Sequence, residues 1–235
     1  MYFSRVRINP EAYMDYKILK VFQGNMYSIH QLIWQLFSNQ PAAKRDFLFR
    51  QEYEYEQLET PRGPKGIPIF YVVSERQPLP FTDELIVDVK DYNPKIIRGM
   101  ELDFKVRVNP VIARLISGKN HSSKHDVLME TKRLAKQQGI TDKFIIQTMM
   151  NDAAIKWFIR KGEQFGYNIE NKNSIEVSSY LQHRIRKKNA KIQFSSVDLS
   201  GALKVIEPTS FFELLSNGIG HSRSFGCGMM MIKRH

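Results

Sequence analysis

The stretch MYSIHQLIWQLF, residues 26–37, decides the interpretation of the first half of the chain. Its apolar residues recur at intervals of three and four, a spacing that gives a helix one apolar face. These residues are Ile29, Leu32, Ile33 and Leu36. The period changes to two over residues 46–55, as in a half-buried strand. The two patterns predict a helix followed by a strand.

Strand patterns flank this pair of elements on both sides. Residues 2–8 predict an opening strand, and residues 69–74 and 85–89 predict two further strands. Only a single helical turn fits between the last two strands, because Pro78 and Pro80 interrupt that stretch. The order is β-α-β-β-(short α)-β, a ferredoxin-like pattern with a reduced second helix.

The second half of the chain repeats this order. The predicted elements are a strand over 101–108, helices over 123–138 and 141–161, a strand hairpin over 175–185 and 191–206, a helix over 208–217 and a strand over 228–232. A length of 235 residues accommodates two domains of about 100 residues each. We therefore predict an α+β protein of two tandem ferredoxin-like (βαββαβ) domains, over 1–95 and 99–235.

The charge of the chain indicates a polyanionic partner. The net charge is +11 and the pI is near 9.6. Residues 1–118 hold 16 Lys and Arg against 14 Asp and Glu, whereas residues 119–235 hold 19 against 10. A basic second half favours nucleic-acid binding, and a solvated basic surface is the alternative.

The sequence also bears on location and on metals. No apolar run reaches the roughly 18–20 residues that span a bilayer, and residues 1–8 lack the apolar region of an export signal. Cys227 is the single cysteine, and the sequence contains neither HExxH nor a paired-carboxylate motif. We expect a cytoplasmic protein with no membrane partner, no metal site and no cofactor.

His30 lies at the edge of the apolar face of the predicted helix. With that face at zero and about 100° per residue, Tyr27, His30 and Trp34 fall near 160°, 100° and 140°. A histidine at such an edge can titrate near neutral pH and can reach a ligand lying across the helix. The alternative is a cluster of rings that only packs against the neighbouring strand.

A second candidate site is the glycine-rich segment NGIGHSRSFGCG, residues 217–228. Glycine permits positive φ angles and close approach, so the peptide N–H groups of such a segment can face phosphate oxygens. The residues assigned to this site are Gly220, His221, Ser222, Arg223, Ser224 and Gly226. The spacing matches neither the dinucleotide-binding fingerprint nor the phosphate loop. The alternative is a helix C-cap followed by a tight turn and a bulge.

A third candidate is the tip of the predicted strand hairpin. Residues 180–191 hold five basic residues and no acidic one. These basic residues are Arg184, Arg186, Lys187, Lys188 and Lys191. A cationic hairpin can enter a groove or straddle phosphates, which predicts contact with RNA or DNA. The alternative is a solvated charged face.

Together these pieces resemble the CasE-type CRISPR repeat endoribonucleases, the RNA-processing subunits of the type I-E surveillance complex Cascade. The resemblance runs along the whole chain, and it is weak over residues 111–180. The matching stretches are MYFSRV (1–6), YSIHQLIWQLF (27–37), RDFLF (45–49), FKVRVNP (104–110) and GIGHSRSFGCG (218–228). The helix and the glycine-rich segment are the most specific of them.

The resemblance implies a fold, an activity and a site. It implies two ferredoxin-like domains and cleavage of CRISPR repeat RNA at the base of a hairpin, with the product kept bound among other Cascade subunits. The family's catalytic histidine falls on His30 and its active-site tyrosine on Tyr27. Some members carry a lysine one helical turn later, where this chain has Trp34 and Gln35, so Arg223 is our substitute for stabilising charge. We assign Arg107 to the RNA contacts together with the hairpin and the glycine-rich segment.

RNA chemistry fits this assignment without a metal. The ribose 2′-OH is an internal nucleophile beside the phosphate, so the products are a 2′,3′-cyclic phosphate and a 5′-hydroxyl. His30 acts as general acid or base and Tyr27 shares the proton transfer or orients the nucleophile. The alternatives are a non-catalytic RNA-binding subunit of a CRISPR ribonucleoprotein, and a metal-dependent nuclease or DNA-binding protein.

Overall fold

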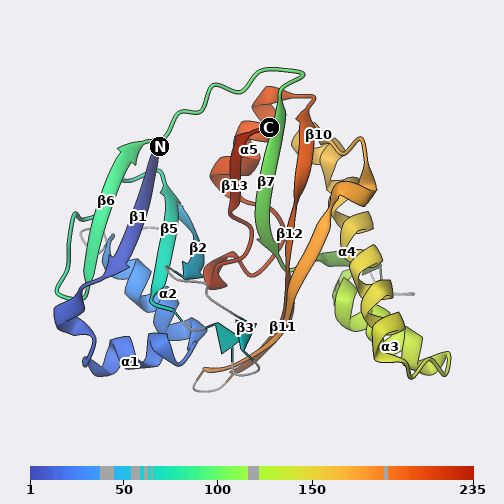
Figure 1. Cartoon of the computed structure of the whole chain (residues 1–235), viewed down its shortest axis with the longest axis horizontal. Helices are drawn as coiled ribbons and strands as arrows, with labels where there is room; N and C mark the ends of the chain where they lie inside the picture. The colour runs from blue at the N-terminus through green and yellow to red at the C-terminus, as the bar shows by residue number, and fades with distance from the viewer. Residues whose placement is uncertain (38–44, 54–58, 61–62, 65, 116–121, 188–189) are drawn as a thin grey trace. The chain divides into compact units, whose positions relative to one another are not determined.

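The structure of the chain is a computed structural model (Figure 1). The structure describes residues 1–37, 45–53, 59–60, 63–64, 66–115, 122–187 and 190–235. Backbone contacts divide the chain into two compact units. The first unit comprises residues 1–95 together with 223–229, and the second comprises 96–222 together with 230–235.

The sheet of the first unit has the ferredoxin-like order. Its strands are β1 (Tyr2–Ile8), β2 (Phe47–Tyr53), β5 (Pro68–Ser74) and β6 (Leu85–Asp91). They lie in the order β2-β5-β1-β6, and every neighbouring pair is antiparallel. Two short strands, β3 (Glu59–Thr60) and β4 (Gly63–Pro64), pair separately. This order confirms the predicted fold class for the first half of the chain.

The described helices of the first unit precede β2. They are α1 (Tyr16–Phe22) and α2 (Met26–Gln35), after a short 3-10 turn, η1 (Pro10–Ala12). Helix α2 was predicted, and Asn25 caps it because its Oδ1 accepts the N–H groups of Tyr27 and Ser28 at 3.1 Å each. Helix α1 was not predicted. The single helical turn expected between β5 and β6 was wrong: residues 75–84 contain no helix, because prolines there remove backbone donors.

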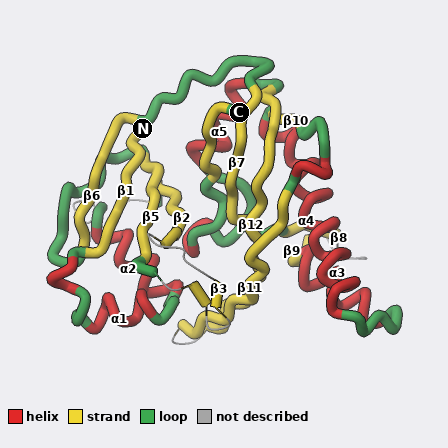
Figure 2. Tube along the Cα trace, in the orientation of Figure 1, coloured by secondary structure: helices red, strands yellow, loops and turns green. Residues whose placement is uncertain are grey.

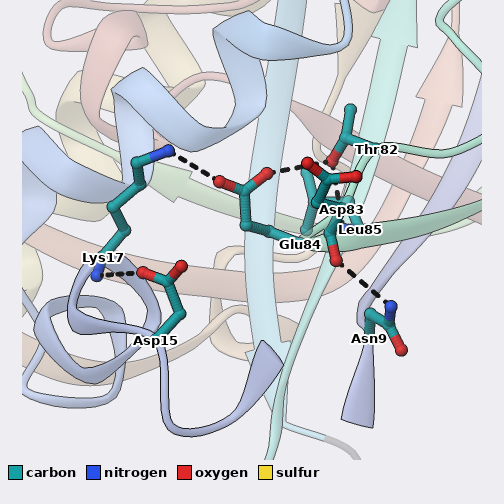
Figure 3. A network of polar contacts seen from close by, with 7 residues as sticks. All are labelled: Asn9, Asp15, Lys17, Thr82, Asp83, Glu84 and Leu85. Carbon is teal, nitrogen blue, oxygen red and sulfur yellow. Dashed lines mark hydrogen bonds and ion pairs between the residues drawn. The ribbon is translucent and has the colours of Figure 1, made fainter. Parts of the chain in front are cut away.

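Polar contacts attach α1 to the turn before β6 (Figure 3). Lys17 of α1 donates from Nζ to Oε1 of Glu84 at 2.7 Å, and this hydrogen bond raises the pKa of Lys17. Glu84 is 8% exposed, so its charge benefits from the ion pair. Asn9 donates from Nδ2 to the carbonyl of Asp83 at 3.1 Å. The start of α1 and the start of β6 are therefore joined by side chains as well as by the core.

The core of the first unit lies between its helices and one face of its sheet. Helix α2 contributes the face that the sequence predicted, with Ile29, Leu32 and Ile33 all at 3% exposure or less. The remaining members include Val6, Ile18, Val21, Phe47, Phe49, Phe70, Val72 and Leu85. Since the buried residues recur every three or four positions along this helix, its position on the sheet fixes which side chains lie at the edge of the core.

The second unit also has the ferredoxin-like order. Its strands are β7 (Glu101–Val108), β10 (Tyr167–Asn168), β11 (Glu176–Lys187), β12 (Ala190–Val205) and β13 (Met230–Arg234). Strand β12 pairs antiparallel with β11 and β7, and β7 pairs antiparallel with β13. Strand β10 pairs with the end of β12. A separate hairpin of β8 (Val111–Leu115) and β9 (Ser122–Asp126) was not predicted.

The helices of the second unit are α3 (Val127–Gln137), α4 (Lys143–Phe165) and α5 (Pro208–Asn217), with 3-10 turn η2 (Lys172–Ser174). The predicted start of α3 at residue 123 was wrong, because residues 122–126 pair with β8 instead. The predicted end of α4 at Gly162 was also wrong. A Cβ at Gly162 would overlap the carbonyl oxygen of Tyr167, so glycine is required there for packing, and Gly166 caps the helix.

The hairpin of β11 and β12 has a distal part that pairs only with itself. Strand β7 pairs with residues 197–204 of β12, whereas residues 190–196 pair with β11 alone. Figure 2 shows these two strands running past the end of β7.

Within the described residues, no helix is long and apolar enough to cross a membrane.

Candidate functional site

In the first unit, His30 is flanked by two aromatic rings. It lies on the first turns of α2, half-buried, beside the core residue Ile29. The centre of its ring is 5.8 Å from that of Trp34 and 6.4 Å from that of Phe225. Its Nδ1 atom is buried. Tyr27, three residues earlier on the helix, is also half-buried. The expected position of His30 at the edge of the core is confirmed.

Residues from the end of the chain complete this environment. The 3-10 turn η3 (Arg223–Phe225) belongs to the first unit, where Phe225 lies against His30. Arg45 donates from Nη1 to Oγ of Ser224 at 2.9 Å. Two guanidinium groups, those of Arg45 and Arg223, are thereby brought into the part of the first unit that contains the imidazole.

The two arginines are partly buried cations that repel one another. Burial lowers the pKa of Arg45, and the charge of Arg223 lowers it further. Burial also lowers the pKa of Arg223. Arginine nevertheless stays protonated in proteins, so both charges persist at any working pH. Arg223 was predicted from the sequence, but Arg45 was not, because a lone arginine before a strand carries no signal.

Two predicted site glycines have packing roles inside their own units. A Cβ at Gly226 would lie 3.2 Å from the ring of Phe49 in the first unit. A Cβ at Gly220, whose φ is +78°, would lie 3.1 Å from the carbonyl oxygen of Asn109 in the second unit. These contacts account for the two glycines through close approach. Contact of either glycine with RNA stays a prediction.

In the second unit, a buried amide holds the other part of the glycine-rich segment. Asn109, 2% exposed, accepts from Oγ of Ser222 at 3.1 Å and forms a backbone bridge with His221. Its Nδ2 donates to the carbonyl of Ser195 at 2.7 Å and to Oδ2 of Asp126 at 3.1 Å. Ser222 has a φ of +58°, which is unusual for a residue with a side chain. The network therefore determines where His221 and Ser222 lie.

The distal hairpin has one packed face and one exposed face. His183 stacks on Phe194 with ring centres 4.4 Å apart and shares a hydrogen bond of 2.7 Å with Ser196. Burial, and then the charge of Arg107, lower the pKa of His183 to about 4. Arg184, the next residue, is exposed. The neutral His183 was not among the predicted site residues, and it supports the strand that presents Arg184.

The other predicted basic residues of the hairpin are described only in part. Arg186 and Lys187 lie on β11, and Arg186 pairs in register with Lys191 of β12. Lys188 lies outside the described residues. Contact of these residues with RNA stays a prediction.

Arg107, predicted as an RNA contact, forms a two-pronged ion pair. Its Nε and Nη2 donate to the two carboxylate oxygens of Asp198, at 2.9 Å each. The side chains are 18% and 8% exposed. An RNA phosphate would have to compete with this carboxylate, so Arg107 is a weaker candidate than the exposed Arg184.

Among the described residues, no group of three or more His, Cys, Asp or Glu is placed to hold a metal ion.

The two sheets and their helices define an α+β protein with tandem ferredoxin-like domains. The chain belongs to the CRISPR associated protein family, whose sequence model matches residues 1–234. It is 26% identical over 220 residues to the CRISPR system Cascade subunit CasE of Escherichia coli K12, covering 92% of this chain and 95% of that one. The resemblance found in the sequence is thereby confirmed.

Solved structures share the fold. The chain is similar to Cas6e of Escherichia coli K-12, with 22% identity and a TM-score of 0.61 over the whole of both chains. It is also similar to Cse3 of Thermus thermophilus bound to an RNA representing a pre-cleavage complex. There the identity is 17% and the TM-score 0.69, over 99% of this chain and 98% of that one. Both likenesses confirm the predicted tandem ferredoxin-like architecture.

Proposed function

We propose that this chain is an endoribonuclease that cleaves CRISPR repeat hairpin RNA and retains the product as a subunit of Cascade. The similar Escherichia coli protein is a Cascade subunit, and the similar Cse3 structures are of an endoribonuclease bound to RNA. A basic second half and an exposed Arg184 on the hairpin support an RNA partner. We expect the chain and its RNA in the cytoplasm.

The observation that carries the catalytic part of this proposal is the contact between His30 and Phe225. That contact places the imidazole beside the turn that bears Arg223. An imidazole, which can donate or accept a proton, and a permanent cation are two components that phosphodiester cleavage by an internal nucleophile uses. No metal-activated water enters this chemistry, because the RNA supplies its own nucleophile.

The reaction follows from these groups. The ribose 2′-oxygen attacks the adjacent phosphorus while its proton passes to a general base, and the bond from phosphorus to the 5′-oxygen breaks as that oxygen takes up a proton. The products are a 2′,3′-cyclic phosphate and a 5′-hydroxyl. His30 transfers one of these protons, Tyr27 shares the proton transfer or orients the nucleophile, and Arg223 stabilises the charge that develops on the phosphate oxygens.

The two predicted domains divide the work in this proposal. The N-terminal domain, residues 1–95, carries the catalytic helix. The C-terminal domain, predicted over residues 99–235, holds the RNA through the hairpin and the start of the glycine-rich segment, while residues 223–229 pack with the first unit and contribute Arg223 to catalysis. Phosphate contacts release counterions from the RNA. The logarithm of the binding constant should therefore fall linearly with the logarithm of the salt concentration.

The test is single-turnover cleavage of a repeat hairpin RNA in EDTA, comparing the unaltered chain with His30→Ala. General acid–base catalysis contributes about 10²–10⁴-fold, so the rate should fall by that factor with only a modest loss of affinity. His235→Ala is the matched control, since His235 is exposed and pairs with Asp103 at 2.6 Å. A 2′-deoxy nucleotide at the cut site should abolish cleavage and leave binding intact.

Each alternative gives a different result in the same assay. A non-catalytic RNA-binding subunit would form no product at any protein concentration. A metal-dependent nuclease would lose its activity in EDTA. Cleavage of the 2′-deoxy substrate would rule out the internal nucleophile.

A further inference from the structure

Arg45 is held beside the proposed catalytic turn by a contact that spans most of the sequence. It lies directly before Asp46 and β2, and its Nη1 donates to Oγ of Ser224, the residue that follows Arg223. A guanidinium has five N–H donors, so one hydroxyl acceptor leaves most of its donors for another ligand. The side chain is only partly exposed.

Arg45 has no carboxylate partner in the part of the chain that the structure describes. The adjacent carboxylate, that of Asp46, is already engaged by Arg76, whose Nε and Nη2 donate to it at 2.6 and 2.8 Å. Besides burial, the like charge of Arg223 lowers the pKa of Arg45. A partly buried cation beside a second cation is unfavourable until an anion joins them.

The chemistry of the anion follows from the two guanidinium groups. A guanidinium presents a planar fork that matches two oxygens of a phosphate group. Phe225, next to Ser224, lies against the ring of His30, so an anion held by Arg45 is close to the group proposed to transfer protons. In a cleavage reaction, the phosphate gains negative charge on its oxygens in the transition state, and preorganised donors stabilise that charge.

We propose that Arg45 binds the phosphate at which the RNA is cut and acts together with Arg223 to stabilise its charge. This inference rests on the proposed function and adds to it a second cation, Arg45, beside Arg223. Within this inference, Ser224 positions the guanidinium of Arg45 through the hydrogen bond that its Oγ accepts.

The first test measures binding of a repeat hairpin RNA that carries a 2′-deoxy nucleotide at the cut site and therefore stays intact. Affinity is measured as a function of salt for the unaltered chain, Arg45→Gln and Arg133→Gln. Arg133 is an exposed arginine on α3 and serves as the matched control. We expect Arg45→Gln to reduce the salt slope by about 0.7–0.9, the value of one phosphate contact, and Arg133→Gln to leave it unchanged. An unchanged slope in Arg45→Gln overturns the inference.

The second test measures the single-turnover cleavage rate at saturating RNA. We expect Arg45→Gln to lower this rate by about 10- to 100-fold, and Arg45→Lys to restore part of it because lysine keeps the charge without the fork. Melting temperature separates this role from a structural one. Removing an uncompensated cation should leave the melting temperature of Arg45→Gln unchanged or raised. A lowered melting temperature with an undiminished rate overturns the inference.

The failure of this inference is distinguishable from failure of the proposed function. If His30→Ala abolishes cleavage while Arg45→Gln keeps both rate and salt slope, only the role of Arg45 is wrong. If His30→Ala cuts at the full rate, the proposed catalysis is wrong. The salt slope on the uncleavable RNA still decides whether Arg45 contacts a phosphate.

Discussion

Replacing Asp126 by asparagine should destabilise the second unit far more than the same change at Asp142. Both residues are helix N-caps. Asp142 accepts only the N–H groups of Phe144 and Ile145, at the start of α4. Asp126 caps α3 in the same way and also accepts three hydrogen bonds from elsewhere in the fold. Those donors are Nδ2 of Asn109, the backbone N–H of Ser195 and Oγ of Ser195.

The difference between the two changes can be worked out from these contacts. Asparagine is as good an N-cap as aspartate, so the cap is retained in both variants, and both lose the same charge–dipole interaction of about 0.3–1 kcal/mol. In Asp126→Asn, however, the new NH₂ group faces donors from Ser195 and Asn109, which are 0% and 2% exposed. An unsatisfied buried donor costs about 1–3 kcal/mol, so two of them cost about 2–6 kcal/mol.

The assay is urea denaturation followed by tryptophan fluorescence. The chain has two tryptophans, Trp34 in the first unit and Trp157 in the second. A Trp34→Phe background leaves Trp157, which is 2% exposed and donates to the carbonyl of Val111 at 3.1 Å, as the reporter of the second unit. With an m-value of about 2 kcal/mol/M, the midpoint should fall by about 1–3 M in Asp126→Asn.

The matched variant decides the interpretation. Asp142→Asn should lower the midpoint by no more than about 0.5 M, since it loses only the charge at a helix end. If the two variants unfold at midpoints that differ by less than about 0.3 M, the buried network does not stabilise the second unit and the reasoning is wrong.

Three further outcomes are expected. Gly162→Ala should lower the free energy of unfolding by at least about 2 kcal/mol, because its Cβ would overlap the carbonyl of Tyr167. Gly139 has open space around it, so Gly139→Ala should lower that free energy by only about 1 kcal/mol, for its positive φ. Urea denaturation compares the two variants. The pKa of His183 is about 4 in the folded chain and lies below its unfolded value, so the stability of the fold should fall as the pH drops from about 6.5 towards 4. This part of the fall in melting temperature should be absent from His183→Gln. Arg184→Gln should weaken RNA binding and lower its salt slope by about 0.7–0.9, and an unaltered slope in anisotropy titrations would count against the hairpin as an RNA contact.

Periodicity was sufficient wherever burial follows a regular pattern along one element. The alternation of Leu102, Phe104, Val106 and Val108 predicted β7 and its buried face, and all four residues are 3% exposed or less. Helix α1 has only seven residues, fewer than two turns, so no period is resolved and packing of Ile18 and Val21 stabilises it. The start of α3 was misplaced because residues 122–126 obtain strand partners from β8.

The sequence by itself determined the order of the main strands of the two sheets, the family resemblance and the place of His30, because each depends on residues that are neighbours along the chain. Only the tertiary structure decided what lies around His30. Arg45 and Ser224 are 179 positions apart, and no local pattern relates them. Their contact forms because residues 223–229 pack with the first unit, which brings two like charges and an imidazole together. Packing between distant segments, not local propensity, therefore selects the residues of the site.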